Sequence, residues 1–335
     1  STNGNLLTQQ YYNNLEFTGN SIKSLTNVDL GINGNLSILG GSVNNAFNRD
    51  IDIKGNWINN VSSLAFVPGT GTVRFLGVNQ NIGGSATTNF YNLTSAGTGT
   101  KTLGISQNIN NNLLISLNST LDVSASNFAI DLKGSYTGNG VFNAQQGTVT
   151  LNGIAQQQIG GTGNTSFYNL TLQNSAGASV NNPTNLINTL TCNVGNFINN
   201  ATTFTLLSSA SNTARIAPLL VGTYTGEITM QRFAPGGVTG WAFISAPVTG
   251  AKINQWTDDF PSSGFIGSSG YSGGFISIFY YDEQIGGAWD SPNSYVPVTN
   301  AASNNIIPGV GCWVYLGTSL NTTTDINIDV TGTIV

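Results

Sequence analysis

The chain of 335 residues carries charged side chains at only 7% of its positions and has a net charge of −5. Histidine is absent, which excludes serine–histidine and cysteine–histidine catalytic pairs and the commonest zinc ligand. Lysine and arginine form no cluster, and no stretch approaches the length of about 18 apolar residues that spans a bilayer. Neither nucleic-acid binding nor a transmembrane segment is therefore expected.

The composition changes partway along the chain. Residues 1–200 contain 38 asparagines, whereas residues 201–335 contain 8. Acidic residues outnumber basic ones after residue 226, and four of the five tryptophans follow residue 240. No linker rich in proline or serine lies near the change. The sequence therefore predicts two directly packed domains, over residues 1–222 and 223–335.

The first region contains a long internal repeat. GTVRFLGVNQNIGG over residues 71–84 returns as GTVTLNGIAQQQIGG over residues 147–161, a spacing of 76–77 residues. Within it, apolar-x-apolar pairs recur about every 19 residues, from Leu15/Phe17 through Val73/Phe75 to Leu190/Cys192. Asn and Gly between the pairs favour turns. Alternation with a period of two predicts strands whose apolar pairs point inward.

These patterns predict an all-β fold in which residues 1–222 form a right-handed parallel β-helix of about eleven coils. A β-sandwich is the rival architecture, but stacked coils explain the long repeat better. The abundant asparagines are expected to turn inward and form amide ladders along the stack. Cys192 falls in an inward position and is predicted to be a small buried residue with an inert thiol.

Residues 223–335 are predicted to form a small antiparallel β-sandwich or a jelly-roll-like domain. Strand-like runs separated by Gly, Ser and Pro lie at residues 227–233, 241–247, 275–282, 311–317 and 325–335. This domain is expected to cap one end of the β-helix and hide its open strand edge. The first coil has no obvious cap, so end-to-end assembly into filaments is an open alternative.

Four segments of the second region carry a family resemblance: GWAFISAPVTGAKINQWTDDFPSSGF, SIFYYDE, IPGVGCWVYLG and DVTGTI. They resemble a module of large secreted surface proteins of Bacteroidetes-type bacteria, which are typically exported by the type IX secretion system. The upstream repeats of the GTVTLNG and FYNLTL kind are similar to the stalk regions of those proteins. The resemblance implies a secreted, extracellular protein of the cell surface.

Acidic residues of the second region are candidate ligands for a calcium ion, the one cofactor that the sequence suggests. They are Asp258, Asp259, Asp282, Glu283 and Asp290. Carboxylates suit this hard cation, but the DxDxDG loop of helix–loop–helix calcium sites is absent. The alternative is that these residues are solvated loop charges that keep the surface soluble.

Aromatic residues interleave with these acids and suggest a carbohydrate-binding face. Trp256 and Trp289 lie in polar sequence surroundings and are, with Tyr295, the candidate sugar platforms. Trp241, Trp313 and Tyr315 lie in apolar strands and are expected to be core residues. The carbohydrate hypothesis predicts that Trp256 or Trp289 is exposed beside a carboxylate.

A polysaccharide-degrading β-helix is the least favoured hypothesis, because it needs clustered carboxylates and a cation on one outer face. The comparable residues are Asp50, Asp52, Lys54, Asp131 and Lys133, from the segments IDIKG and IDLKG. Both segments are expected to occupy equivalent coils, with Asp52 and Asp131 pointing outward to pair with a lysine of the neighbouring coil. Such pairs are worth less than about 1 kcal/mol.

The sequence therefore favours a non-catalytic extracellular structural or adhesive protein, a rigid β-helical stalk with a terminal β-sandwich. The partner would be a cell-surface or extracellular polysaccharide or protein, or a second copy of the chain in a filament. A carbohydrate-binding module on a spacer is the alternative.

Overall fold

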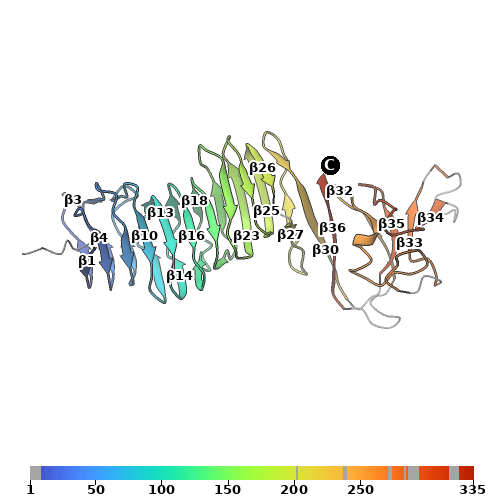
Figure 1. Ribbon diagram of the computed structural model, residues 1–335, viewed down its shortest axis with the longest axis horizontal. Coiled ribbons are helices and arrows are strands. Elements are labelled where there is room, and N and C mark those ends of the chain that lie inside the picture. The colour runs from blue at the N-terminus through green and yellow to red at the C-terminus, as the bar shows by residue number, and fades with distance from the viewer. Residues whose placement is uncertain are drawn as a thin grey trace, which may run out of the picture. The chain divides into compact units, whose positions relative to one another are not determined.

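The computed structural model describes residues 9–200, 203–236, 240–270, 274–282, 284–285, 294–316 and 324–335 (Figure 1). The chain divides into two compact units. The β-helix unit comprises residues 1–202 and 216–224, and the second unit comprises residues 203–215 and 225–335. The predicted boundary after residue 222 lies beside the break after residue 224, but segment 203–215 belongs to the second unit. Strands β28 (Arg215–Ile216) and β29 (Thr223–Thr225) cross these breaks.

The β-helix unit is a parallel β-solenoid of about ten turns. Sheet A runs along the whole unit and contains β1 (Gln9–Tyr12), β4 (Asp29–Ile32), β7 (Ile51–Ile53), β10 (Thr72–Phe75), β13 (Asn92–Ser95), β16 (Leu113–Ile115), β19 (Tyr136–Gly138), β22 (Gln157–Gly160), β24 (Ala178–Val180) and β26 (Asn196–Asn199). From β1 to β26 the strands begin 18–23 residues apart, so one turn is slightly longer than the predicted 19-residue step.

Two further parallel layers complete the turns as far as residue 143, and the later turns contain strands of sheets A and D only. Sheet B contains β2 (Leu15–Phe17), β5 (Leu36–Ile38), β8 (Trp57–Asn59), β11 (Gln80–Gly83), β14 (Gly99–Leu103), β17 (Ser119–Asp122) and β20 (Val141–Asn143). Sheet C contains β3 (Ile22–Ser24), β6 (Ser42–Asn44) and β9 (Phe66–Val67). Sheet D follows it with β12 (Asn89–Phe90), β15 (Gln107–Ile109), β18 (Ile130–Leu132), β21 (Thr148–Leu151), β23 (Thr165–Gln173) and β25 (Thr184–Val194).

The core of the β-helix unit is a column of alternate residues, as the period-two pattern predicts. Leu93 pairs in register with Leu113 in sheet A, and both are buried. Each fully buried aliphatic side chain stabilises the fold by roughly 1.5–3 kcal/mol. Trp57 lies inside, 4.8 Å from the ring of Phe66. Cys192 is buried as predicted, and burial raises the pKa of its thiol to about 11.

The apolar pairs that predict the coils do not form one column. The pairs at Leu15 and Leu36 lie in sheet B, those from Ile51 to Leu113 in sheet A, and those from Ile130 to Leu190 in sheet D. All of these sheets bury alternate residues, so the same short pattern fits each side of a turn. A sequence series can therefore pass from one sheet to the next without a visible break.

The long repeat is consequently out of phase with the turns. Val73 lies in sheet A, whereas its repeat equivalent Val149 lies in sheet D. Asp52 and Asp131 are separated in the same way, so the prediction that they occupy equivalent positions of the solenoid is wrong. Local structure is nevertheless retained, because a repeated segment keeps the bonds that it makes to the preceding turn.

Two glutamines at corners of the turns, Gln80 and Gln157, show that the repeated segments keep their local bonds; we call them the corner glutamines. Gln80 and Gln157 point inward from sheets B and A. The Oε1 atom of Gln157 accepts the backbone N–H of Gly153 at 2.8 Å, and its Nε2 donates to the carbonyls of Leu132 and Gly134 at 2.9 and 2.6 Å. Gln80 makes the corresponding bonds to Gly77, Ile53 and Gly55. One side chain thus satisfies three buried backbone groups at each corner.

Most asparagine ladders lie at the rim of the turns, not inside as predicted. The Oδ1 atom of Asn35 accepts the backbone N–H of Asn56 at 2.8 Å, and Asn56 accepts that of Asn81 at 2.8 Å. Asn112 and Asn139 bond Ser135 and Thr162 in the same way. Asparagine suits this position because its carbonyl oxygen reaches a backbone donor that the strand ladder leaves free at the turn.

The second unit contains two sheets and no α-helix among its described residues. The long sheet has the order β27 (Phe204–Leu206), β30 (Glu227–Ala234), β36 (Ile326–Ile334) and β32 (Val248–Thr249), and only the β27–β30 pair is parallel. The four-stranded sheet has the order β31 (Gly240–Ile244), β35 (Cys312–Leu316), β33 (Ile278–Tyr281) and β34 (Tyr295–Pro297), and it is antiparallel. A short 3₁₀ helix spans Ile253–Gln255. A small antiparallel sheet agrees with the predicted terminal sandwich.

Candidate functional site

The four-stranded sheet of the second unit separates its side chains by type. Trp241 pairs with Tyr315 across β31 and β35, and Trp313 pairs with Phe243 on one side and Phe279 on the other. Residues paired in register share one face of an antiparallel sheet. The intervening residues Ile278, Cys312 and Val314 occupy the opposite face and are buried. One face therefore faces the core with aliphatic side chains, and the other collects aromatic rings.

We call this second surface the aromatic face. Its members are Trp241, Phe243, Phe275, Phe279, Tyr281, Tyr295, Trp313 and Tyr315. The rings of Trp241 and Trp313 stack with centroids 4.2 Å apart, and Trp313 contacts Tyr295 at 4.8 Å. Tyr295 in turn contacts Tyr281 at 5.4 Å. These contacts hold the rings in a continuous platform.

The aromatic face is open to solvent. Trp241 is 38% exposed, Phe243 is 61% exposed and Phe275 is 54% exposed. The other five rings are half-buried, mainly against one another. Soluble proteins rarely leave such a cluster of large apolar side chains uncovered without a binding role. The aromatic face is therefore a candidate binding surface.

A cavity of about 650 Å³ adjoins the aromatic face at the C-terminal end of β33. It is lined by Tyr280, Tyr281, Asp282, Gln284, Val296, Ile307, Gly309, Val310 and Gly311. Tyr281 belongs to both the aromatic face and the cavity. The hydroxyl of Tyr280 donates to the carbonyl of Asn305 at 2.8 Å, and burial raises the pKa of that hydroxyl. Apolar walls, tyrosine rings and one carboxylate thus meet in one concave site.

Two of the predicted sugar platforms, Trp256 and Tyr295, lie in different surroundings. Trp256 is 1% exposed, so the prediction that it offers a ring to a ligand is wrong. It follows the 3₁₀ helix and packs into the core of the unit, although its sequence neighbours are polar. Tyr295 lies on the aromatic face, whereas Trp289 lies outside the described residues. The expectation that Trp241, Trp313 and Tyr315 are core residues is also wrong, because all three belong to the aromatic face.

The described acidic candidates Asp258, Asp259 and Asp282 are not grouped around one position. Asp259 Oδ2 accepts the backbone N–H of Asp329 at 2.7 Å, and burial raises the pKa of Asp259 to about 7, with Asp329 and Asp258 adding to the effect. Asp282 Oδ1 instead accepts the N–H of Gln284 at 2.9 Å. In the described part of the chain, no three His, Cys, Asp or Glu side chains are grouped to hold a metal ion. Glu283 and Asp290 lie outside that part.

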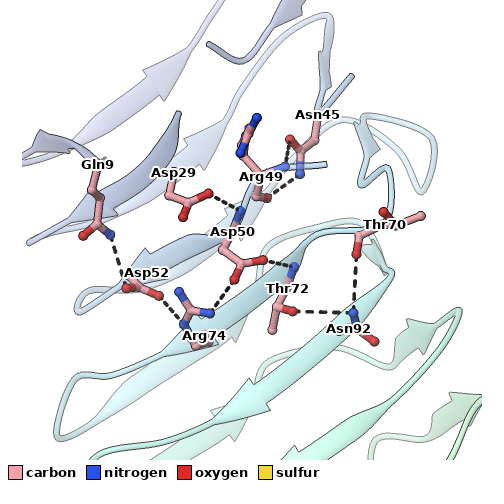
Figure 2. A network of polar contacts seen from close by, with 10 residues as sticks. All are labelled: Gln9, Asp29, Asn45, Arg49, Asp50, Asp52, Thr70, Thr72, Arg74 and Asn92. Carbon is pink, nitrogen blue, oxygen red and sulfur yellow. Dashed lines mark hydrogen bonds and ion pairs between the residues drawn. The ribbon is translucent and has the colours of Figure 1, made fainter. Parts of the chain in front are cut away.

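The carboxylates of the β-helix unit hold its turns together (Figure 2). Arg74 Nη1 donates to Asp50 Oδ2 at 2.6 Å, and Arg74 Nε donates to Asp52 Oδ1 at 2.5 Å. Asp50 Oδ1 also accepts the N–H of Thr72 at 2.9 Å. Likewise, Asp29 Oδ1 accepts the backbone N–H of Asp50 at 3.0 Å. Asp52 is therefore paired between neighbouring turns, but its cation is Arg74 and not the predicted lysine, and no ion pair of Asp131 is found among the described residues.

The two lysines of this hypothesis bond asparagines of the preceding turn. Lys54 Nζ donates to Asn33 Oδ1 at 3.1 Å, and Lys133 Nζ donates to Asn110 Oδ1 at 3.0 Å. The equal bonding of the two lysines reflects the repeated sequence, although they follow strands of different sheets. Of the side chains that a degradative site would need, Asp50, Asp52, Lys54 and Lys133 are thus bonded between turns.

Comparison of the chain with family models, with curated proteins and with solved structures returned no match. Among the residues that the structure describes, no helix has the length and apolar character needed to cross a bilayer. The functional argument therefore depends on the surfaces of the molecule itself.

Proposed function

We propose that the chain is a non-catalytic extracellular adhesive protein, in which the β-helix is a spacer and the second unit binds carbohydrate through the aromatic face. The exposed platform around Trp241 and Trp313 carries this proposal. The C–H groups of a pyranose ring form an apolar surface that packs on an aromatic ring, and neighbouring polar groups bind its hydroxyls. Display at the cell surface is part of the proposal and follows from the family resemblance.

The dimensions of the aromatic face favour a polymer over a single sugar. Cross-strand neighbours in a sheet are about 5 Å apart, and the ring contacts extend over four strands from Trp241 to Tyr295. Several rings in a row can each pack against one sugar of a chain. A weak contact at each ring then adds to a useful total affinity, because the linked sugars bind at high effective concentration.

The bonding of the polar side chains supports a spacer role for the β-helix. Asp29, Asp50 and Asp52 accept hydrogen bonds from neighbouring turns, and Asp50 and Asp52 share Arg74. Such groups stiffen the stack between turns and are already engaged with protein donors. We assign them this structural role in the proposal, in preference to acid–base catalysis.

Binding to insoluble and soluble polysaccharides tests the proposal. The intact chain should be retained by at least one β-linked polysaccharide in pull-down and affinity electrophoresis. Trp313→Ala should weaken retention at least about tenfold, since loss of a stacked ring costs roughly 1–3 kcal/mol. Phe47→Ala is the matched control, because Phe47 is an exposed aromatic residue of the β-helix unit. Equal binding by both variants, or no binding by the intact chain across a glycan array, would reject the carbohydrate function.

A further inference from the structure

The cavity beside the aromatic face has a distinctive electrostatic character. Among the described residues that line it, Asp282 is the one acidic residue and neither lysine nor arginine is present. Asp282 Oδ1 accepts the N–H of Gln284. Among the described residues, no group donates to Asp282 Oδ2, so this oxygen is available to a ligand. Tyr280 and Tyr281 provide rings on the same wall.

The net charge of the second unit also favours a cationic ligand. The unit contains three basic and eight acidic residues, which gives it a net charge of −5. The β-helix unit has six of each and is neutral. Anionic ligands such as uronic acid polymers would be repelled from the second unit, whereas cationic ligands would be attracted to it.

We propose that the cavity is a subsite for a protonated amino sugar, and that the aromatic face binds a glucosamine-containing polymer. This inference depends on the proposed carbohydrate function and names its ligand class. The ammonium group of the sugar would donate to Asp282 Oδ2, and the ring of Tyr281 would add a cation–π contact. Tyr281 belongs to both surfaces, so a polymer that stacks on Tyr295 and Trp313 can extend directly into the cavity.

The cavity size agrees with this assignment. A volume of about 650 Å³ lies within the range of sites for small organic ligands, and it exceeds the room that a single ion would need. The apolar residues Val296, Ile307 and Val310 can pack against the pyranose ring, while Gln284 offers an amide for its hydroxyls. A cation alone would leave these walls without a partner.

Two matched hexasaccharides test the inference by isothermal titration calorimetry on the full chain. β-1,4-linked glucosamine hexamer carries amines, and the N-acetylglucosamine hexamer has the same backbone without charge. We expect the glucosamine hexamer to bind about tenfold more tightly, and Asp282→Asn to remove most of that difference. Asp258→Asn is the control, because it removes an equal charge from an exposed position that does not line the cavity.

The outcomes separate the two proposals. If Trp313→Ala weakens both hexamers while Asp282→Asn affects only the glucosamine hexamer, both proposals stand. If both hexamers bind equally and Asp282→Asn changes neither, or if a galacturonic acid hexamer binds as well, the amino-sugar inference fails and the carbohydrate function survives. If Trp313→Ala has no effect on any hexamer, the aromatic face is not the binding surface and both proposals fail.

Discussion

The two units of this protein treat their polar and aromatic side chains in opposite ways. In the β-helix unit, aromatic rings such as Trp57 are buried, and asparagines at the rim bond the next turn. In the second unit, a platform of rings faces solvent and a carboxylate oxygen of Asp282 has no donor among the described residues. A surface whose groups bond one another gives a stable rod, whereas a surface with unused groups is suited to binding.

The largest expected effect concerns the corner glutamine of the β-helix. Gln157→Leu should lower the free energy of unfolding by about 4 kcal/mol, because it leaves the N–H of Gly153 and the carbonyl of Gly134 without their partner and removes one of the two bonds to the carbonyl of Leu132. Urea denaturation followed by circular dichroism measures the change. Gln158→Leu is the control, since Gln158 is exposed, and equal losses in the two variants would contradict the role of the corner bonds.

A second substitution tests how closely the turns stack. Gly161 has φ of +126°, and a Cβ atom there would lie 2.2 Å from the carbonyl oxygen of Gly138 in the preceding turn. Gly161→Ala should therefore cost about 3 kcal/mol. The adjacent Gly160→Ala should cost much less, since a Cβ atom at Gly160 meets nothing within 4 Å. Comparison of the two midpoints in urea tests the close stacking, which similar midpoints would contradict.

The β-helix also contains a buried lysine that we expect to weaken it. Lys101 is 0% exposed, its Nζ donates to the carbonyl of Thr98 at 2.9 Å, and no acidic side chain in the described part of the chain pairs with it. Burial lowers the pKa of this lysine. Lys101→Met should raise the free energy of unfolding by about 1–2 kcal/mol, because the cation no longer has to be desolvated. Lys54→Met, at an exposed position, should give no such gain. A lower midpoint for Lys101→Met would mean that the interior needs the charge.

The smallest effect belongs to the second unit and depends on pH. The pKa of Asp259 is about 7 in the folded chain, against 3.8 for a free aspartate. Between these values the folded state keeps a proton that the unfolded state has lost, so stability should fall as pH rises from 4 to 7 and then level off. Because Asp259 is half-exposed, the change should stay below about 1 kcal/mol.

Asp259→Asn isolates this pH effect. The asparagine oxygen can still accept the N–H of Asp329, so the contact is retained while the charge is removed. The variant should lose most of the decline between pH 4 and 7, measured as the thermal midpoint of the second unit. Asp329, whose pKa burial also raises, accounts for the remainder. An unchanged pH profile in the variant would show that Asp259 is not the group responsible.

The strands and the solenoid could be predicted from sequence because alternation with a period of two is a local property. The assignment of strands to sheets could not, because Val73 and Val149 have the same neighbours in sequence yet lie in different sheets. The sequence was enough to predict that asparagines form hydrogen-bonded ladders along the stack. Their position at the rim was not, because it depends on which backbone donors the neighbouring turn leaves free.

The aromatic face had a signal in the sequence that polarity of the surroundings obscured. In WAFI, IFYY and CWVYL, every aromatic residue except Tyr280 occupies one parity, and Ala242, Ile278, Cys312 and Val314 occupy the other. Small and aliphatic residues on one parity mark the core side, so the rings had to face outward. Trp256 has polar neighbours, but Gln255 and Asp259 bond the backbone of β36 while the indole is buried. The burial of Trp256 can therefore be predicted only from the tertiary structure.

The corner glutamines have an evolutionary consequence. Gln80 and Gln157 make the same bonds at corners between different pairs of sheets, so a duplicated segment did not need to span a whole number of turns to be accepted. An inserted copy rotates the downstream sequence around the axis and still finds equivalent neighbours. Such a solenoid can gain or lose length by unequal recombination at many points in its gene, which makes the reach of the molecule an easily varied trait.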